Sequence, residues 1–299
     1  MRRRVLLALP LAAAWPLRAR PQTAPLRVVA SFSILGDLTR QVVGEEAEVA
    51  TIVGPDADAH HVQPRPSHIE AIRRAAMVVR NGLGFDGWFE RALQAASFRG
   101  VAVTASEGFP TRPAPRRAGG HAHGPHDPHI WQDVAGARHM LGRILAGAER
   151  ADPARAEAHR ARAAAADRRL AELDAWIRAE IARIPPERRV VLTSHDAFGY
   201  FAAAYGVRFL APLGISPQAE PSAQQVAALI RQVRAQNITA VFIENMTNPA
   251  LLERLAAEAG VRVRGRLYAD ALSGPDGPAP DYEAMMRHNL RLMLAAWTS

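Results

Sequence analysis

The chain has 299 residues, of which 48% are apolar and 22% charged, a balance typical of a globular protein and not of a disordered one. This length exceeds what one compact core needs and suits two domains of ordinary size. The formal charge of +8 falls to +3 when residues 1–24, which carry five arginines and no acidic residue, are set aside. No basic run remains that would follow a phosphate backbone, so the composition argues against a nucleic-acid-binding protein.

The first 24 residues have the form of an export signal. A basic start, "MRRR", precedes an apolar run, "VLLALPLAAAWPL", that is too short to cross a bilayer as a helix. The chain contains no cysteine, so an exported product would carry neither disulfides nor the lipid-bearing thiol of a lipoprotein. We therefore predict a signal peptide over residues 1–24 and a mature protein in the periplasm with no lipid anchor. A retained membrane anchor is the alternative.

Strand-like and helical segments alternate from residue 26 to residue 104. In chain order they are "LRVVASF", a helix around "ILGDLTRQVVG", "EVATIVG", a helix around "SHIEAIRRA", "MVVRNG", a helix around "FDGWFERALQAA", and "VAVTAS". Such alternation predicts βαβ units and a mostly parallel sheet. Together with a further helix from about Val134 to Arg150, these segments give a predicted N-terminal α/β lobe over residues 25–150.

A Pro-, Gly- and His-rich stretch, "GFPTRPAPRRAGGHAHGPHD", interrupts this alternation. Nothing in it supports a regular element, so we predict a His-rich loop over residues 115–127. One interpretation is that His121, His123 and His126 collect metal ions weakly as an accessory site. The other is that they belong to a solvated linker and bind metal only incidentally. The sequence leaves both open.

A long helix is predicted next. From Pro153 to Ile184 the sequence has almost no helix breaker, and Asp152 before Pro153 suits a helix start. A helix of this length would span about 48 Å, so residues 151–185 are expected to link two lobes. Alternation resumes over residues 186–299, which form a predicted C-terminal α/β lobe. The predicted fold class is α/β, with two lobes of mostly parallel sheet joined by one long helix and a ligand cleft between them.

Common nucleotide-binding and hydrolase motifs are missing from the sequence, among them GxGxxG after a strand, GxxxxGK[ST], GxSxG and HExxH. Without cysteine, a metal site would have to use nitrogen and oxygen ligands. Four segments next to predicted strand ends offer such donors: His60 in "GPDADAHHVQPRPSH", His129 in "DPHIWQD", His195 in "VVLTSHDAFGY" and Asp270 in "RLYADALSG". Each is ambiguous alone, because exposed histidines and helix-capping aspartates produce similar patterns.

In this order the four segments resemble the zinc- and manganese-binding solute-binding proteins of ABC importers, a family often called cluster A-I. The segment around His60 resembles the pattern D-x-H-x-[YF]-x-P-x-P-x-D, and "DPHIWQD" resembles DPHxWxD. "TSHDAFGYFAAAYG", and "LYADALS" followed by "YEAMMRHNL", resemble the remaining ligand segments. Val62 and His68 depart from the first pattern, where an aromatic residue and an aspartate are usual. His61 and His68 are alternative nitrogen donors.

The resemblance implies two α/β lobes joined by a rigid helix, with a metal held between them by His60, His129, His195 and Asp270. Three imidazoles and one carboxylate suit tetrahedral Zn²⁺, whereas Mn²⁺ favours more oxygen ligands. We therefore expect a zinc-type member, with manganese or another divalent metal as the alternative. A zinc-dependent hydrolase is the rival from another class, but a fourth protein ligand would close the coordination sphere, so we predict a binding protein and not an enzyme.

The resemblance also implies partners for the protein. It would deliver Zn²⁺, as transported ligand, to the membrane permease of an ABC importer, and a periplasmic metallochaperone is a further candidate partner. We expect the protein to be a monomer. Each ligating imidazole should donate its other N–H to a neighbouring acceptor, for which Asp133, Asp196 and Glu244 are the candidates.

Overall fold

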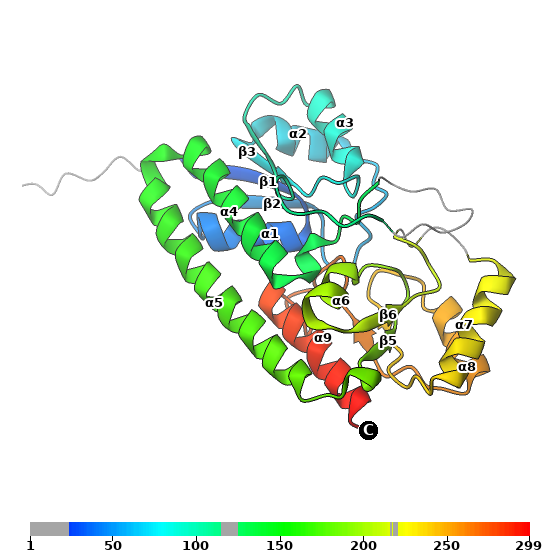
Figure 1. Ribbon diagram of the computed structural model, residues 1–299. Coiled ribbons are helices and arrows are strands. Elements are labelled where there is room, and N and C mark those ends of the chain that lie inside the picture. Colours follow the sequence, from blue (N-terminus) through cyan, green and yellow to red (C-terminus); the bar gives the residue numbers. More distant parts are fainter. Residues whose placement is uncertain (1–23, 115–124, 216, 218–220) are drawn as a thin grey trace, which may run out of the picture.

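The computed structural model of the chain describes residues 24–114, 125–215, 217 and 221–299. The predicted signal peptide, apart from its last residue, and His121 and His123 lie outside these residues. Two α/β lobes are joined by a long helix that runs along one side of the molecule (Figure 1). No helix within the described part of the chain is long and apolar enough to cross a membrane.

A four-stranded parallel sheet forms the first lobe. Its order is β2-β1-β3-β4, and Val28 of the central strand β1 is in register with Val49 on one side and Met77 on the other. After its first residue β1 is buried throughout, as expected for a strand covered on both faces. The elements of this lobe are β1 (Arg27–Phe32), α1 (Ser33–Val43), β2 (Glu48–Val53), α2 (Pro66–Arg74), β3 (Met77–Arg80), α3 (Gly87–Ala95) and β4 (Val101–Thr104).

The linking helix is α5 (Ala156–Ala182), which packs against α1, α4 (Val134–Ala151) and the final helix α9 (Tyr282–Trp297). It begins later than the sequence predicted, because Pro153–Arg155 form a short 3₁₀ turn, η2, between α4 and α5. Its buried residues recur every three or four positions and so form one stripe along the helix. They are His159, Ala163, Ala166, Leu170, Leu173, Ile177 and Ile181.

The second lobe contains two short parallel pairs, β5 with β6 and β7 with β8, linked by a bridge between Leu192 and Val241. Its strands are shorter than the sequence predicted. In "VRVRGRLY", for example, Gly265 has a φ of 154°, and only the two residues after it form a strand. The elements are η3 (Pro186–Arg188), β5 (Val190–Leu192), α6 (Gly199–Tyr205), β6 (Arg208–Leu210), α7 (Ala223–Ala235), β7 (Ile243–Glu244), α8 (Ala250–Ala259) and β8 (Arg266–Leu267).

Two apolar cores match this arrangement. The larger core runs from the first lobe through α4, α5 and α9, and the smaller one lies between the β5 and β7 strands and helices α7 and α8. The predicted fold class is confirmed: both lobes are α/β, and every strand pair within them is parallel. The loops that follow several strands meet between the lobes, where ligands of open α/β sheets bind.

Candidate metal centre

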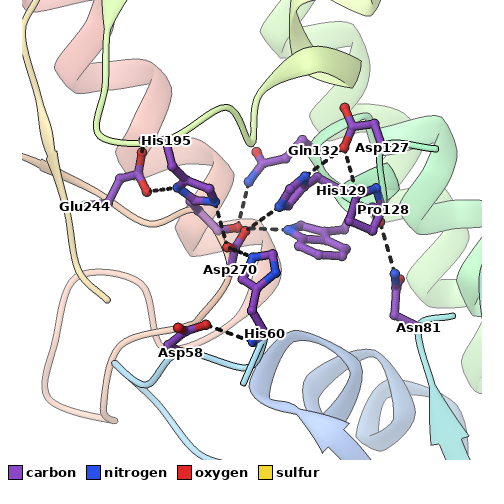
Figure 2. Close-up of polar contacts among 12 residues, drawn as sticks. Asp58, His60, Asn81, Asp127, Pro128, His129, Gln132, His195, Glu244 and Asp270 are labelled. Carbon is purple, nitrogen blue, oxygen red and sulfur yellow. Dashed lines mark hydrogen bonds and ion pairs between the residues drawn. The ribbon is translucent and has the colours of Figure 1, made fainter. Parts of the chain in front are cut away.

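Four residues from both lobes converge at one point between the lobes (Figure 2). His60, His129, His195 and Asp270 are all buried, and one nitrogen or oxygen atom of each lies within 4.8 Å of the others. The Asp270 Oδ2 atom lies 3.1 Å from His60 Nε2 and 3.0 Å from His195 Nε2, and Asp270 Oδ1 lies 3.6 Å from His129 Nε2. The structure thus brings together the four residues that the sequence analysis selected.

Each of these side chains is placed by the loop that carries it. His60 lies in the loop after β2, His195 follows β5, and Asp270 follows β8. His129 directly precedes the 3₁₀ turn η1 (Ile130–Gln132). The loops after β2, β5 and β8, which belong to three separate sheets, and the segment before η1 thus bring residues far apart in sequence into one cluster.

Two carboxylates orient the imidazole rings of His129 and His195 by contacting the ring nitrogen that faces away from Asp270. His129 Nδ1 donates a hydrogen bond to Asp127 Oδ1 at 2.7 Å, and His195 Nδ1 donates to Glu244 Oε2. A proton held on Nδ1 leaves Nε2 as the atom that faces Asp270 and the other rings, which is the tautomer that a metal ligand needs.

The structure selects among the three acceptors that the sequence proposed. Glu244 contacts His195 as predicted. The prediction for Asp133 was wrong, because its carboxylate accepts the Ala135 N–H and caps the start of α4. The Asp196 main-chain N–H donates to the Gly214 carbonyl, and a contact of its carboxylate with a ligand ring stays a prediction.

Asp127 holds the His129 ring although it lies at the end of the predicted loop 115–127 and was not among the expected acceptors. Asp127 is 2% exposed, and its main chain pairs with Arg112 at the base of that loop. A signal was present in the sequence, since Asp58 and Asp127 each stand two residues before a ligand histidine. Asp58 accepts the His60 N–H at 2.8 Å and Asp127 accepts the His129 N–H at 3.0 Å. This is the turn that an aspartate favours two residues ahead of a main-chain donor.

The other candidate histidines lie outside the cluster. His61 and His126 have exposed positions. His68 Nδ1 accepts the Arg65 N–H at the start of α2, so its ring serves a helix end. None of the three belongs to the group of metal-competent side chains found among the described residues.

Charge within the cluster shifts its acid–base behaviour. Burial disfavours a charged ring, but Asp270 and a hydrogen-bonded carboxylate outweigh it and raise the pKa of His129 to about 9. Burial is likewise outweighed by Glu244 and Asp270, which raise the pKa of His195 well above its usual value. For His60 burial prevails over the attraction of Asp270 and lowers the pKa. The pKa of Asp270 lies well below its usual value, because the facing His195 and His129 rings overcome the effect of burial.

Three of the converging atoms are buried and have ion-pair neighbours but make no hydrogen bond: His129 Nε2, His195 Nε2 and Asp270 Oδ1. Leaving buried polar atoms unpaired is costly, so their convergence calls for a further partner. A divalent cation satisfies three lone pairs at once, and nitrogen and carboxylate donors suit first-row metals. The residues present therefore fit a bound metal ion.

Comparison with known proteins agrees with this geometry. Residues 28–296 match the family described as zinc-uptake complex component A, periplasmic. The chain belongs to this family. Its members are substrate-binding proteins of metal transporters, so the protein is a metal-binding substrate-binding protein of the ABC-transporter class and not an enzyme.

Members of the family with similar sequences are named for different metals. The chain is 31% identical to the manganese-binding lipoprotein MntA of Halalkalibacterium halodurans, over 89% of this chain and 86% of the relative. It is 32% identical to the iron-binding protein YfeA of Yersinia pestis, over 87% and 82%. Among solved structures, the periplasmic zinc-binding protein TroA of Treponema pallidum superposes with a TM-score of 0.83 at 25% identity, covering 90% of this chain and 98% of TroA. These relatives share the family and are named for manganese, iron and zinc.

Proposed function

We propose that this protein binds Zn²⁺ through His60, His129, His195 and Asp270 and delivers it to the permease of an ABC importer. The observation that carries the proposal is the donor set, with three imidazoles and one carboxylate converging within 4.8 Å. Four ligands of this kind suit tetrahedral Zn²⁺, whereas Mn²⁺ favours six ligands that are mostly oxygen.

The surroundings of the site support tight capture. All four side chains are buried, and two rings are held in the ligating tautomer by Asp127 and Glu244. The free-energy cost of ordering the ligands is thus met largely when the chain folds, which favours high affinity.

We place the mature protein in the periplasm without a lipid anchor, although several relatives are named lipoproteins. We propose that it acts there as a monomer.

Metal binding by the chelator-treated mature protein tests the proposal. Zn²⁺, Mn²⁺ and Fe²⁺ affinities are measured for the wild type, for His195→Ala and for His139→Ala, a control histidine that bonds to the Glu107 carbonyl away from the site. We expect one tight Zn²⁺ per chain, lost in His195→Ala and kept in His139→Ala. Deletion of residues 119–126 should leave the tight site intact.

Manganese or iron is the second candidate, favoured by the names of two relatives at 31% and 32% identity. Tighter binding of Mn²⁺ or Fe²⁺ than of Zn²⁺ would establish that alternative. Loss of tight binding in the loop deletion, with retention in His195→Ala, would refute the assignment of the four ligands.

A further inference from the structure

The loop after β3 reaches the metal centre without supplying one of its four ligands. It has the sequence "NGLGFD", residues 81–86, and joins β3 to α3. Phe85 in this loop is buried, and its ring packs against the His60 ring in an edge-to-face arrangement, with centroids 4.6 Å apart and planes at 66°. The same ring lies 6.0 Å from the His129 ring. The loop thus brings an aromatic ring against two of the ligands.

The backbone of this loop determines where the Phe85 ring lies. Three consecutive residues are in the left-handed region, with φ values of 89°, 55° and 82°: Gly82, Leu83 and Gly84. Residues with a side chain rarely adopt this region, so other contacts must hold the turn. Asp86 supplies two of them, because its buried carboxylate accepts the Asn81 N–H at 2.6 Å and the Gly82 N–H at 2.9 Å. Backbone conformations that need such support are concentrated at functional sites.

Two further rings hold Phe85 on the side of the first lobe. Phe32 at the end of β1 and Trp131 in η1 each lie 4.9 Å from Phe85, centroid to centroid, and they lie 5.0 Å from each other. All three side chains are buried. Trp131 in turn packs against the His129 ring at 5.3 Å. Because protein interiors are close-packed, the Phe85 ring cannot move away from His60 without displacing these neighbours.

The contact with the imidazole itself makes this packing relevant to metal binding. His60 Nε2 faces Asp270 Oδ2 at 3.1 Å, and it keeps that direction only while the two side-chain torsions of His60 are held. The hydrogen bond from the His60 N–H to Asp58 restrains the backbone and does not act on these torsions. Phe85 restrains them directly, because two rings in contact at 4.6 Å leave the imidazole no room to turn without a clash or a void.

We propose that Phe85 is a positioning residue that holds the His60 imidazole in the ligating orientation. The inference rests on the proposed metal site and adds to it a residue that carries no ligand atom. Without the aromatic ring, the His60 side chain would sample other rotamers in the metal-free protein. Metal binding would then have to order that side chain again, and affinity would fall.

Phe85→Leu tests the proposal, because leucine keeps an apolar side chain and removes the ring. Phe201→Leu is the matched control, since Phe201 in α6 is buried to the same extent and its ring packs on Tyr205 and Phe209 in the second lobe. Each substitution is made in the wild type and in His60→Ala, and Zn²⁺ affinity is measured for all. Thermal unfolding of the metal-free proteins checks folding, and Phe85→Met replaces the leucine variant if that variant is unfolded. The NMR signals of the His60 imidazole in the metal-free proteins report the order of the ring.

We expect Zn²⁺ affinity to fall about tenfold in Phe85→Leu and to stay at the wild-type value in Phe201→Leu. In the His60→Ala background, Phe85→Leu should change affinity by less than about twofold, because the side chain through which Phe85 acts is gone. The His60 signals of metal-free Phe85→Leu should show exchange between ring orientations.

A tenfold loss in both backgrounds would show that Phe85 acts through something other than His60 and would overturn the positioning role. Wild-type affinity and sharp His60 signals in a folded Phe85→Leu protein, with tight Zn²⁺ binding in the wild type, would overturn it as well. Absence of a tight site in the wild type would instead refute the proposed function, and with it this inference.

Discussion

Glu244→Gln should weaken metal binding by misplacing one proton. Glu244 Oε1 accepts the Ser194 and His195 main-chain N–H groups, each at 3.0 Å, and the Thr193 hydroxyl, whereas Oε2 accepts His195 Nδ1. A glutamine must keep its oxygen at the Oε1 position to satisfy these three donors. Its amide nitrogen then faces His195 Nδ1 and donates to it, which moves the imidazole proton to Nε2, the ligating atom.

The size of the effect follows from what this proton blocks. Loss of the acceptor behind a ligating histidine costs about 10–100-fold in metal affinity, equivalent to about 1.4–2.7 kcal/mol. Asp127→Asn is the matched control. Asp127 Oδ1 alone accepts both the His129 N–H at 3.0 Å and His129 Nδ1 at 2.7 Å, so an asparagine oxygen in that position preserves both bonds and the tautomer. We expect Asp127→Asn to lose only a few-fold in affinity, from the missing charge.

Competition against a chromophoric zinc chelator at neutral pH measures both variants, and thermal unfolding of the metal-free proteins checks that each is folded. The tautomer argument predicts a clear order, with Glu244→Gln weaker than Asp127→Asn. Equal losses of zinc affinity in the two variants would show that the carboxylates contribute through their charge and not through proton placement. Wild-type zinc affinity in Glu244→Gln would refute the tautomer argument outright.

Two further predictions concern stability. In α4, Gly142→Ala should stabilise the protein by about 0.5–1 kcal/mol, because the added Cβ would meet nothing within 4 Å. Gly136→Ala, in the same helix, should destabilise it by about 1–3 kcal/mol, because the added Cβ would lie 2.0 Å from the Ile130 carbonyl oxygen. Thermal unfolding gives both signs, and equal shifts would contradict the packing argument. Burial raises the pKa of Asp37 to about 6 from 3.8, so its contribution to stability is complete below about 3.8 and is lost as the pH rises through about 6. Asp37→Asn keeps an oxygen for the Tyr282 N–H and should remove up to about 3 kcal/mol of this pH dependence, less what residual solvent contact screens. Urea unfolding across this pH range tests it, and parallel curves for the two proteins would speak against the assignment.

Candidate donors next to strand ends could be recognised from local order along the chain, and the resemblance of four such segments to a known family selected His60, His129, His195 and Asp270. An apolar strand ends, and a histidine or aspartate follows within a few residues, as His195 does after β5. Parallel pairing brings such ends together only within one sheet, and the four residues come from separate sheets and from the segment before η1, so their convergence was expected from the resemblance and not from strand pairing. The alternation of segments likewise predicted the fold class, since it depends on periodicity and not on side-chain detail.

The supporting contacts could not be predicted, because they depend on how distant segments pack. Asp127 lies two residues before His129 and Asp133 lies four residues after it. Only the folded chain shows that Asp127 holds the His129 ring and that Asp133 caps helix α4. The predicted strands of the second lobe were too long for a related reason. Gly265 at a positive φ interrupts the strand-like run "VRVRGRLY", and the sequence does not distinguish such a glycine from one in a regular strand.

Placing the ligands on both lobes has an energetic consequence for delivery. Trp131 Nε1 and Gln132 Nε2 both donate to the Ala269 carbonyl, at 2.8 and 2.7 Å. The Leu272 N–H donates to Ser33 Oγ and the Asp56 N–H donates to the Leu272 carbonyl, each at 2.9 Å. Apart from the His60–Asp270 contact within the metal site, four hydrogen bonds therefore join residues 269–272 to the first lobe. At about 1 kcal/mol net for each, parting the lobes here costs on the order of 4 kcal/mol before any metal bond is broken. Thermal opening alone would then expose the site only about one part in a thousand of the time. A permease that unloads the protein must therefore bind the opened form roughly a thousandfold more tightly than the closed one, which makes release a property of the docked complex.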